Sequence, residues 1–479
     1  MKILNMKEKD IQKSVKDRKL TMAVIGLGRI GLPTALLFAE AGARVIGVDI
    51  NEEKVANLNK GKAYMNEPGL EMLLQKVLVN GTFSATTDVA NAVSQSDAVM
   101  ICVPTPLNEA KKPDYTPLKN ACENIAKGLK KGALVMIEST VSPTTTEKVV
   151  KPILEQFSGL QATRDFGLAF CPERGAPGGI LNDLRNNTRV VGGIDDKSRE
   201  CAIALLKTVT RAQVFGVSSA TAAEATKLFE NVYRDVNIAL ANELAVLCEK
   251  LKVDMLEIID AANAKTIGFV DKFTQKYRSF SVPCNLHTPG AGVGGDCIPV
   301  NPYYLLQKAE SLQVNLRIVK LVRKTNDAMP HHVVELVIDA LKDLGKKVDE
   351  SRIAILGFTY KGDVDDMRNT PAKPIINKLK ALGANMVGFD PMMGIKQVNE
   401  FKISQSANLD ECLRNADCAV VITDHSNFKK IRLEKMKKLM NTKAAIVDAR
   451  GVFDPKKIVR AGFVYRGVGR SAENLMSSG

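Results

Sequence analysis

The sequence predicts an α/β protein with two Rossmann-like, doubly wound sheets that a long central helix joins. Short apolar segments alternate with helical patterns along most of the chain, which is the arrangement expected of parallel sheets covered by helices. A glycine-rich turn follows the first apolar segment, and a stretch without glycine or proline from Ser219 to about Lys250 separates two α/β halves. A chain of 479 residues is also too long for a single hydrophobic core.

The composition is that of an ordinary globular protein, with 45% hydrophobic and 25% charged residues. The net charge of +14 is spread over the chain without a basic block interleaved with aromatics, so we do not expect nucleic acid as a partner. No apolar segment reaches membrane-spanning length and the charged N-terminus lacks a signal-peptide core, so we expect a cytoplasmic protein without a membrane partner. Nine cysteines without a CxxC pair, and only four histidines, argue against a metal site or a disulfide framework.

The first glycine-rich turn has the spacing of a dinucleotide-binding fingerprint. An apolar strand, Met22–Ile25, leads into Gly26, Gly28 and Gly31, and a helical pattern follows over Thr34–Ala41. The first glycine makes the tight turn, the second lets the backbone approach a pyrophosphate, and the third lets the helix pack on the strand. The helix N-terminus then faces the phosphates.

A carboxylate completes this fingerprint. The next predicted strand, Arg44–Val48, ends in Asp49, at the place where an acid binds the ribose hydroxyls and repels a 2′-phosphate. We therefore expect NAD rather than NADP as the cofactor. The alternative is a Rossmann-like domain that binds no nucleotide.

The next apolar segments are predicted as further strands of this sheet: Asp97–Val103, Ala133–Ile137, Gly167–Phe170 and the short Val190–Val191. Turn-forming, polar or charged residues come directly after three of them: Pro104, Thr105, Glu138, Thr140, Glu173 and Arg174. Because ligands bind at the carboxyl edge of a parallel sheet, we expect these residues at the ligand site. The alternative for each is a plain strand-to-helix loop.

The predicted central helix is long enough to connect two domains and to form a dimer interface. Within it Lys227 and Asn231 are four residues apart and share one face, so they either point together into a site or are solvated separately. A second helical pattern covers Asn301–Lys324, and Pro330 predicts a break after it.

A glycine-rich loop precedes this second helical pattern. It contains Gly290, Gly292, Gly294 and Gly295, and Cys297 comes directly after it. Glycine allows close backbone approach and positive φ, so the loop is suited to present a reactive thiol beside a bound molecule. The alternative is a glycine-rich turn with a buried, inert cysteine.

The C-terminal part predicts a second Rossmann-like sheet without the GxGxxG turn, and its expected elements are the strand Arg352–Gly357, the helix Pro374–Leu382 and the strands Asn385–Phe389, Cys418–Ile422 and Ala444–Asp448. The expected domains are an exposed, charged extension (1–20), an NAD-binding Rossmann domain (21–215), a central helical region that contains Cys297 (216–330), and a C-terminal Rossmann-like domain (331–479).

Seven segments in this order resemble the UDP-glucose/GDP-mannose dehydrogenase family over nearly the whole chain: Gly26–Gly31, Val103–Pro106, Glu138–Thr140, Cys171–Arg174, Lys227–Asn231, Gly294–Cys297, and Gly357–Lys361 with Arg368. The segments 172–177 and 292–299 look like the branch of the family that acts on acetamido sugars. The resemblance implies an NAD-dependent, four-electron oxidation of a UDP-sugar at C6, with UDP-N-acetyl-D-mannosamine as the expected substrate. It also implies that the region 216–330 carries the catalytic cysteine and forms a homodimer or larger homo-oligomer through the central helix, and that the domain 331–479 binds the UDP-sugar.

The resemblance also assigns roles to residues. Cys297 would form a thiohemiacetal and then a thioester, Lys227 and Asn231 would stabilise the oxyanion, and Glu173 and Thr140 would serve the attacking water. The residues expected at the cofactor are Gly26, Gly28, Arg29, Ile30, Gly31, Asp49, Pro104, Thr105, Thr140 and Arg368. Those expected at the substrate are Glu173, Arg174, Lys227, Asn231, Gly294 and Lys361.

Two residues depart from the family pattern. The acetamido branch usually has histidine before the cysteine and aspartate four residues after it, whereas this chain has Asp296 and Asn301. These departures bear on the rate of thioester hydrolysis. They also leave open a non-catalytic protein that binds NAD or a UDP-sugar. The alternative within the enzyme class is the same chemistry on UDP-N-acetylglucosamine or UDP-glucose.

Overall fold

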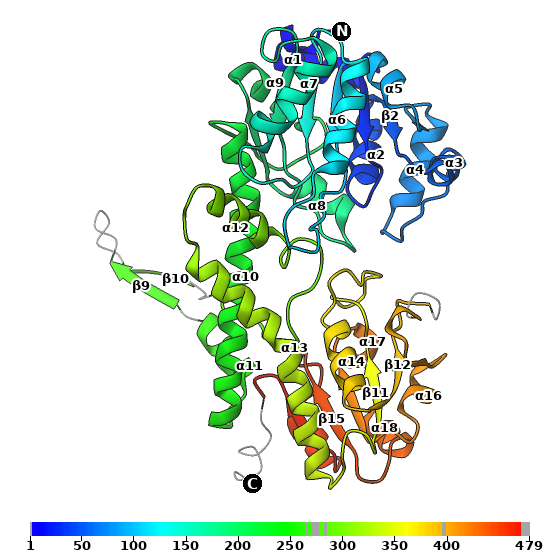
Figure 1. The fold of residues 1–479 in the computed structure, drawn as a ribbon, viewed down its shortest axis with the longest axis vertical. Coiled ribbons are helices and arrows are strands. Elements are labelled where there is room, and N and C mark those ends of the chain that lie inside the picture. The colour runs from blue at the N-terminus through cyan, green and yellow to red at the C-terminus, as the bar shows by residue number, and fades with distance from the viewer. Residues whose placement is uncertain (1, 265, 271–276, 282–284, 395–398, 471–479) are drawn as a thin grey trace. The chain divides into compact units, whose positions relative to one another are not determined.

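The computed structural model describes residues 2–264, 266–270, 277–281, 285–394 and 399–470. The chain forms two units, each with its own sheet (Figure 1). The first consists of Met1–Glu230 and Tyr303–Asn315, and the second of Asn231–Pro302 and Leu316–Gly479. The predicted central helix is present as α10 (Ala220–Leu251), which contributes residues to both units.

The first unit contains an eight-stranded sheet with the strand order β3-β2-β1-β4-β5-β6-β7-β8. Neighbouring strands are parallel except for the antiparallel pair β6 and β7. The strands are β1 (Thr21–Ile25), β2 (Arg44–Val48), β3 (Phe83–Thr86), β4 (Ala98–Ile101), β5 (Leu134–Ile137), β6 (Gly167–Phe170), β7 (Arg189–Gly193) and β8 (Val214–Val217). The order reverses between β1 and β4, which is where a doubly wound sheet binds its ligand.

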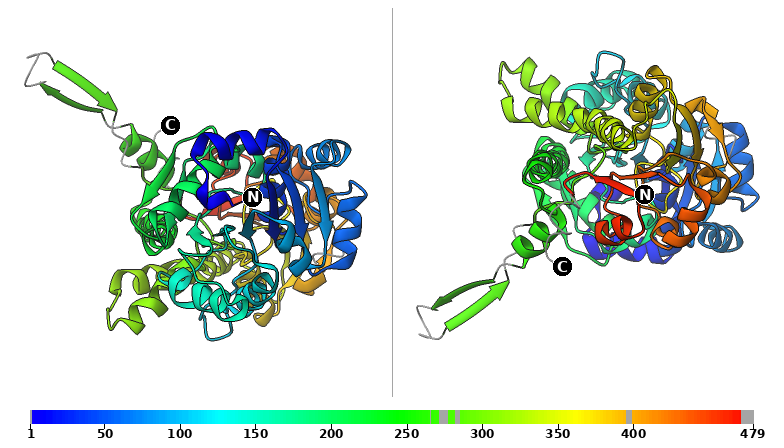
Figure 2. Two further views of the ribbon diagram at one scale, coloured as in Figure 1. Left: turned by 90° about the horizontal axis from the view of Figure 1, so that it is seen from above. Right: turned by 90° about the horizontal axis from the view of Figure 1, so that it is seen from below.

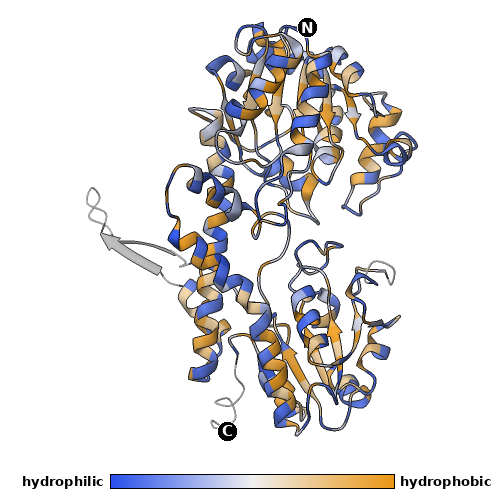
Figure 3. Cartoon of the chain, in the orientation of Figure 1, coloured by the Kyte–Doolittle hydropathy of each residue, from blue (hydrophilic) through white to orange (hydrophobic). Residues whose placement is uncertain are grey.

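Helices cover both faces of this sheet and bury an apolar core on each. One face is covered by α1 (Glu8–Lys16), α2 (Gly31–Ala41), α3 (Glu52–Asn59), α4 (Leu70–Val79), α8 (Ile180–Asn186) and α9 (Asp196–Leu206). The other is covered by α5 (Val89–Gln95), α6 (Thr116–Gly128), the π-helical turn η2 (Thr146–Val150), α7 (Lys151–Ser158) and the start of α10. Figure 3 shows the strands as hydrophobic and the helices as two-faced, as this burial requires. The first unit also contains the short 3₁₀ helix η1 (Ile3–Asn5) and most of α12 (Asn301–Ser311).

The N-terminal segment was expected to be an exposed extension, and this expectation is wrong. Ile3, Ile11, Val15 and Leu20 are buried in the core of the first unit, and α1 packs against α9. The charged residues of α1 occupy its outer face, so a high charge density in the sequence concealed an amphipathic helix.

The second unit contains a six-stranded, fully parallel sheet with the order β13-β12-β11-β14-β15-β16. Its strands are β11 (Arg352–Leu356), β12 (Asn385–Phe389), β13 (Ser404–Gln405), β14 (Cys418–Val421), β15 (Ala445–Asp448) and β16 (Val464–Gly467). One face is covered by α11 (Met255–Asn263), α13 (Arg317–Asp343) and α14 (Ala372–Ala381), and the other by α16 (Leu409–Leu413), α17 (Ser426–Lys429), α18 (Leu433–Leu439) and α19 (Pro455–Arg460). The prediction of two Rossmann-like sheets is confirmed.

The described part of the second unit also contains two smaller elements. The strands β9 (Thr266–Val270) and β10 (Tyr277–Ser281) pair antiparallel, and Figure 2 shows this ribbon extending away from the helices of its unit. A short 3₁₀ helix, η3 (Asn399–Phe401), precedes β13. No helix in the described part of the chain has the length and apolarity needed to cross a bilayer.

Pro330 was expected to end a helix, but it lies inside α13. The break comes earlier: α12 ends at Ser311 and α13 begins at Arg317. A proline cannot donate to the carbonyl one turn before it, which is that of Asn326. Gly292 packs against the turn of α13 between Asn326 and Pro330. A Cβ on Gly292 would lie 3.2 Å from the proline ring and 3.3 Å from the Asn326 carbonyl oxygen. The glycine loop thus fits against the interrupted turn of α13.

Candidate active site

The glycine turn after β1 has the geometry that a dinucleotide needs. Gly26 has a φ of +91°, and a Cβ there would lie 2.6 Å from the Cys102 carbonyl oxygen. A Cβ on Gly31 would clash with the carbonyl of Gly26, whereas a Cβ on Gly28 would meet nothing within 4 Å. The first and third glycines are therefore required by packing, and the second presents bare backbone to open space, which fits a pyrophosphate.

Asp49 closes this turn from the end of β2. Its Oδ2 accepts hydrogen bonds from the Leu27 amide at 3.0 Å and from Lys54 Nζ at 2.8 Å, and its Oδ1 accepts one from the Asn51 amide at 3.1 Å. The carboxylate is thus held beside the glycine turn, where it fits a ribose diol. Sequence reasoning missed Lys54, which is five residues away in the chain and forms an ion pair with this carboxylate.

The loops after β4 and β5 are tied together at the same edge of the sheet. Thr105 Oγ1 donates to the carbonyl of Thr140 at 2.7 Å, and Ser139 Oγ donates to the carbonyl of Val103 at 2.7 Å. The hydroxyl of Tyr304, from α12, donates to the carbonyl of Thr105. The structure therefore places Thr105 and Thr140 side by side, as the positions of their strands predicted.

Glu173 and Lys227 form a buried ion pair in the first unit. Lys227 Nζ donates to Glu173 Oε1 at 2.8 Å and to the Glu173 carbonyl at 2.6 Å, while the Gly175 amide donates to Glu173 Oε2 at 2.5 Å. Burial alone would raise the pKa of Glu173, but the Lys227 charge, these hydrogen bonds and the charge of Arg189 together lower it below its ordinary value. The pair thus joins an ionised carboxylate to an ammonium group at the carboxyl edge of the sheet.

Arg174, expected at the substrate, has other partners in this structure. Its guanidinium forms an ion pair with Glu230 on α10, and its NH1 donates to the Thr188 carbonyl at 2.6 Å. This arrangement ties the loop after β6 to the central helix.

Sequence reasoning missed Glu224, which lies three residues before Lys227 on α10. It is fully buried and accepts from the Thr144 amide at 2.6 Å and from the amide and hydroxyl of Thr146 at 2.7 Å each. Burial raises the pKa of Glu224 to about 7, even though these donors oppose the shift. Thr144 has a φ of +79°, unusual for a β-branched residue, so Glu224 holds a strained loop that comes after Thr140. The feature of the sequence that could have revealed Glu224 was an acidic residue on the apolar face of the predicted helix.

A buried ion pair between Glu138, which the sequence placed at the ligand edge, and Arg189, which sequence reasoning missed, lies under the same edge. Arg189 NH2 donates to Glu138 Oε1 at 2.5 Å, and both side chains are buried. Thr34 Oγ1 donates to Glu138 Oε2 at 3.0 Å, and the Cys102 thiol contacts the same oxygen at 3.2 Å. This network links the strands β4, β5 and β7 beneath the ligand edge. The signal that could have revealed Arg189 was an arginine directly before the apolar strand segment Val190–Val191.

In the second unit, the glycines beside Cys297 are required by contacts within the chain. A Cβ on Gly294 would lie 2.5 Å from Tyr360 Cβ, and a Cβ on Gly295, whose φ is +89°, would lie 2.9 Å from the Tyr360 ring. The Gly295 amide also donates to the Arg368 carbonyl at 2.8 Å. The sequence suggested that a ligand comes close to the backbone of these glycines. In the structure it is Tyr360, in the loop after β11, that comes close to them. The result is a fixed loop that presents the partly exposed Cys297.

Asn231 lies beside the cysteine loop. Its Nδ2 donates to Asn301 Oδ1 at 2.6 Å, and the Asn301 amide donates to the Cys297 carbonyl at 2.9 Å. Both asparagine side chains are buried. Asn301, one of the two departures from the family pattern, therefore links Asn231 to the cysteine loop.

The other departure, Asp296, pairs with Arg368. The Arg368 guanidinium also forms three hydrogen bonds to Asp366: NH2 donates to Oδ2 at 2.7 Å, and Nε donates to Oδ1 at 3.0 Å and to Oδ2 at 3.2 Å. Burial would lower the pKa of Arg368, but these acids raise it above its ordinary value. Arg368 was expected at the cofactor, and in this structure it is held by acids of its own unit.

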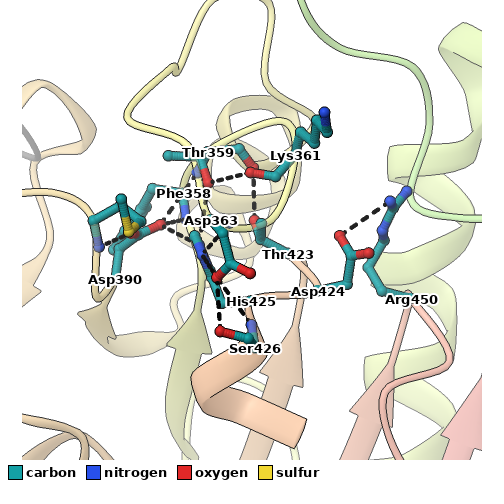
Figure 4. Close-up of polar contacts among 11 residues, drawn as sticks. Phe358, Thr359, Lys361, Asp363, Asp390, Thr423, Asp424, His425, Ser426 and Arg450 are labelled. Carbon is teal, nitrogen blue, oxygen red and sulfur yellow. Dashed lines mark hydrogen bonds and ion pairs between the residues drawn. The ribbon is translucent and has the colours of Figure 1, made fainter. Parts of the chain in front are cut away.

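Lys361 lies in the loop after β11 with its side chain exposed. Figure 4 shows this side chain directed away from a buried cluster formed by Thr359, Asp390 and His425. Its position leaves it accessible to a ligand at the carboxyl edge of the second sheet. In the part of the chain that the structure describes, no group of three or more His, Cys, Asp or Glu residues is placed to hold a metal ion.

Three family models match the chain. The NAD-binding domain of the UDP-glucose/GDP-mannose dehydrogenase family matches residues 20–210, its central domain residues 221–328, and its UDP-binding domain residues 354–455. The glycine turn and Asp49 lie in the first of these ranges, and the residues of this chain fit the NAD that the family binds.

Similar proteins extend over nearly the whole chain. A UDP-N-acetyl-D-mannosamine dehydrogenase of Pyrococcus horikoshii is 36% identical over 94% of this chain and 99% of its own. The solved structure of the Pyrococcus horikoshii enzyme matches with a TM-score of 0.83 at 36% identity, covering 94% of this chain and 99% of that one. A solved NDP-N-acetyl-D-galactosaminuronic acid dehydrogenase of Methanosarcina mazei matches with a TM-score of 0.81 at 35% identity, covering 98% and 99%. The chain therefore belongs to the UDP-glucose/GDP-mannose dehydrogenase family and is an NAD-dependent UDP-sugar dehydrogenase.

Proposed function

We propose that this enzyme oxidises the C6 alcohol of UDP-N-acetyl-D-mannosamine to the carboxylate through a thioester on Cys297. The observation that carries the proposal is the cysteine loop: Cys297 is partly exposed, its backbone carbonyl accepts from the Asn301 amide, and the Asn301 side chain accepts from Asn231. The relative from Pyrococcus horikoshii, which is named for this substrate, supports the choice of sugar.

The proposed reaction proceeds in three stages. The C6 alcohol loses a proton and a hydride to give an aldehyde, and the Cys297 thiolate adds to its carbonyl carbon to form a thiohemiacetal. Loss of a second hydride and the hydroxyl proton gives a thioester. Water then attacks the thioester, releasing the carboxylate and the thiolate. NAD, when bound, supplies the hydride acceptor for each oxidation, so one sugar consumes two NAD.

The buried ion pair of Glu173 and Lys227 in the first unit is suited to proton transfer and to the stabilisation of negative charge. Glu173 is held as the carboxylate and can accept a proton from the attacking water, which Thr140 helps to hold. Lys227 and Asn231 are one turn apart on the continuous helix α10 and stabilise the oxyanion. The Lys227 cation also favours the thiolate form of Cys297.

The binding roles that we propose divide between the two ligands. The cofactor is held by Gly26, Gly28, Arg29, Ile30, Gly31, Asp49, Pro104, Thr105, Thr140 and Arg368. The substrate is held by Glu173, Arg174, Lys227, Asn231, Gly294 and Lys361. To contact these ligands, Arg174 would leave Glu230, and Arg368 would leave Asp296 or Asp366.

We also propose that the enzyme is a homodimer or larger homo-oligomer through α10, and that it works in the cytoplasm. A stripe of large apolar side chains is exposed along this helix: Phe229, Tyr233, Leu240, Leu247 and Leu251. Their spacing places them along one side of the helix, and a second copy of the chain would bury them. Sedimentation of the wild type and of a Leu240→Glu, Leu247→Glu variant tests this, with dissociation expected in the variant.

The decisive experiment supplies purified enzyme and NAD with a panel of UDP-sugars. We expect UDP-N-acetyl-D-mannosamine to be preferred, with two NADH formed per sugar and a carboxylate product seen by mass spectrometry. The solved relative from Methanosarcina mazei favours a galacto-configured acetamido sugar as the second candidate, and the panel also includes UDP-N-acetylglucosamine and UDP-glucose. One NADH per sugar with release of the aldehyde would overturn the thioester route. No turnover with any sugar would favour a non-catalytic binding protein.

Asn301 offers a separate test of the hydrolysis step. An aspartate there can still accept the hydrogen bond of Asn231, but it adds an ionisable group beside the thioester. We expect the Asn301→Asp variant to hydrolyse faster, with less Cys297 adduct in samples quenched during turnover. Absence of adduct in both proteins, with equal kcat, would show that Asn301 has only a structural role.

A further inference from the structure

The loop that carries Lys361 in the second unit is long and lacks helical support of its own. It begins at Gly357, directly after β11, and α14 begins only at Ala372. The Gly357 turn is tight: its φ is +94°, and a Cβ there would clash with Thr423. A loop of this length needs contacts from side chains to hold one conformation.

A buried histidine supplies those contacts on both sides of Lys361. The Asp363 amide donates to His425 Nδ1 at 3.0 Å, and Thr359 Oγ1 lies 3.1 Å from His425 Nε2. Figure 4 shows the imidazole beneath the loop, and the side chain has no exposed surface. His425 therefore contacts residues 359 and 363, which are two positions before and two positions after the lysine.

The hydrogen bonds define the tautomer. Nδ1 accepts from the Asp363 amide, so the proton of a neutral ring is on Nε2. Thr359 Oγ1 donates its own proton to the Lys361 carbonyl at 3.0 Å, so it accepts from Nε2. The second acceptor for Nε2 is Asp390 Oδ2 at 3.1 Å.

Asp390 ties this histidine to the rigid sheet. Its Oδ2 accepts from the Phe358 amide at 2.6 Å, and its Oδ1 accepts from the Met392 amide at 2.8 Å. Burial alone would raise the pKa of Asp390, but His425 and the backbone amides lower it below its ordinary value. The chain of contacts thus runs from the end of β12 through His425 to the backbone that carries Lys361.

We propose that His425 is a positioning residue for the UDP-sugar: it fixes the loop at Thr359 and Asp363 so that Lys361 is presented to the nucleotide diphosphate. The inference rests on the proposed role of Lys361 and adds a residue that acts only through it. Preorganisation of the loop lowers the entropy lost when the ligand binds, and its loss weakens binding.

Two substitutions separate the contacts of the ring. In His425→Asn the amide oxygen replaces Nδ1 and retains the acceptor for Asp363, whereas in His425→Gln the amide group replaces Nε2 and retains the partner for Asp390. His331→Gln is the matched control, because His331 lies on α13 of the same unit and is exposed. The readouts are the affinity for UDP by calorimetry, the affinity for NAD, the melting temperature, and KM against kcat for the UDP-sugar.

Each His425 variant should bind UDP about tenfold more weakly, as expected for the loss of one buried hydrogen bond that holds the loop. KM for the UDP-sugar should rise by a similar factor, with kcat and NAD affinity within twofold of the wild type. In a Lys361→Ala background the same substitutions should weaken UDP binding by less than twofold, because the residue that they position is gone. His425→Ala, which removes both contacts, serves as the reference. Tighter UDP binding in His425→Asn than in His425→Ala would measure the contact with Asp363, and tighter binding in His425→Gln would measure the contact with Asp390.

Three outcomes would contradict the inference, and they are distinguishable. If UDP binding is unchanged in the His425 variants while Lys361→Ala weakens it, the positioning role is wrong and the proposed function stands. If the losses in the Lys361→Ala background equal those in the wild-type background, His425 acts on the ligand by another route. If the wild type binds neither UDP nor a UDP-sugar, the proposed function itself fails.

Discussion

The two sheets of this protein use the same turn at the end of their first strand and equip it for different ligands. Gly26 and Gly357 have φ values of +91° and +94°, and in each case the amide of the next residue donates to a carboxylate oxygen. That carboxylate is Asp49 in the first unit and Asp390 in the second, each directly after the second strand of its sheet. The shared turn is thus a scaffold that fixes the start of the loop.

The two units differ in the residues that come directly after the turn. In the first unit Gly28 leaves open space beside the backbone and α2 begins at Gly31, so bare amides and a helix N-terminus face the ligand. In the second unit Thr359 and the buried His425 fill the corresponding region, and no helix begins until Ala372. The first turn is suited to bind phosphates with its backbone, whereas the second supports a loop that binds with side chains.

The largest expected effect separates chemistry from binding. Cys297→Ala should lower acid formation by about 10⁴-fold or more, because the nucleophile is lost, while NAD and UDP affinities stay within a few-fold. Initial rates and calorimetry measure both. Cys122→Ala is the control, because burial raises the pKa of this thiol to about 12 and keeps it protonated. Substantial acid formation by the Cys297 variant would remove the thioester from the mechanism.

The next prediction tests whether the first turn binds phosphates with bare backbone. Gly28→Ala should weaken NAD binding by about tenfold or more while the melting temperature stays near that of the wild type, because the added methyl group enters only open space. Gly31→Ala should instead lower the melting temperature, since its Cβ would clash with the Gly26 carbonyl. UDP affinity should be unaffected by Gly28→Ala. Unchanged NAD affinity would place the pyrophosphate elsewhere.

Exchange of the two carboxylates for amides compares the turns directly. Asp49→Asn should shift the kcat/KM ratio of NADP to NAD toward NADP by about tenfold, because a repelling charge is lost and Lys54 remains to attract a 2′-phosphate. Asp390→Asn should leave this ratio unchanged and weaken UDP binding. A shift of cofactor preference in both variants would mean that the second sheet also binds the dinucleotide.

The smallest expected effect is a contrast in pH dependence between two buried carboxylates. The pKa of Glu224 is raised to about 7, so the folded state binds more protons than the unfolded state between about pH 4.5 and 7, and stability from this group falls as pH rises. The pKa of Asp390 is lowered, so its contribution is lost as pH falls below its ordinary titration range. Urea unfolding of Glu224→Gln and Asp390→Asn over these ranges should show opposite slopes relative to wild type, of at most about 1.4 kcal/mol per pH unit. Slopes of equal sign would contradict this assignment.

The sequence by itself determined the strands that run into glycines or polar residues, the dinucleotide turn, and the central helix. The predicted strands Arg44–Val48, Gly167–Phe170 and Asn385–Phe389 have the observed bounds, and α10 differs from its predicted range by one residue at each end. These features depend on local patterns, because apolar runs, glycine conformation and helical periodicity act over a few residues. The short strands β3, β8, β13 and β16 lacked such a pattern.

The tertiary structure alone decided which charged groups meet and which segments are buried. Arg174 pairs with Glu230 across 56 positions of sequence, and His425 meets Asp390 across 35. The charged N-terminal segment is buried along one face because α9 packs against it, and position 292 requires glycine because a Cβ there would meet the ring of Pro330 in α13. In each case a partner distant in sequence supplies the hydrogen bond, the charge or the packing surface, and local composition holds no record of that partner.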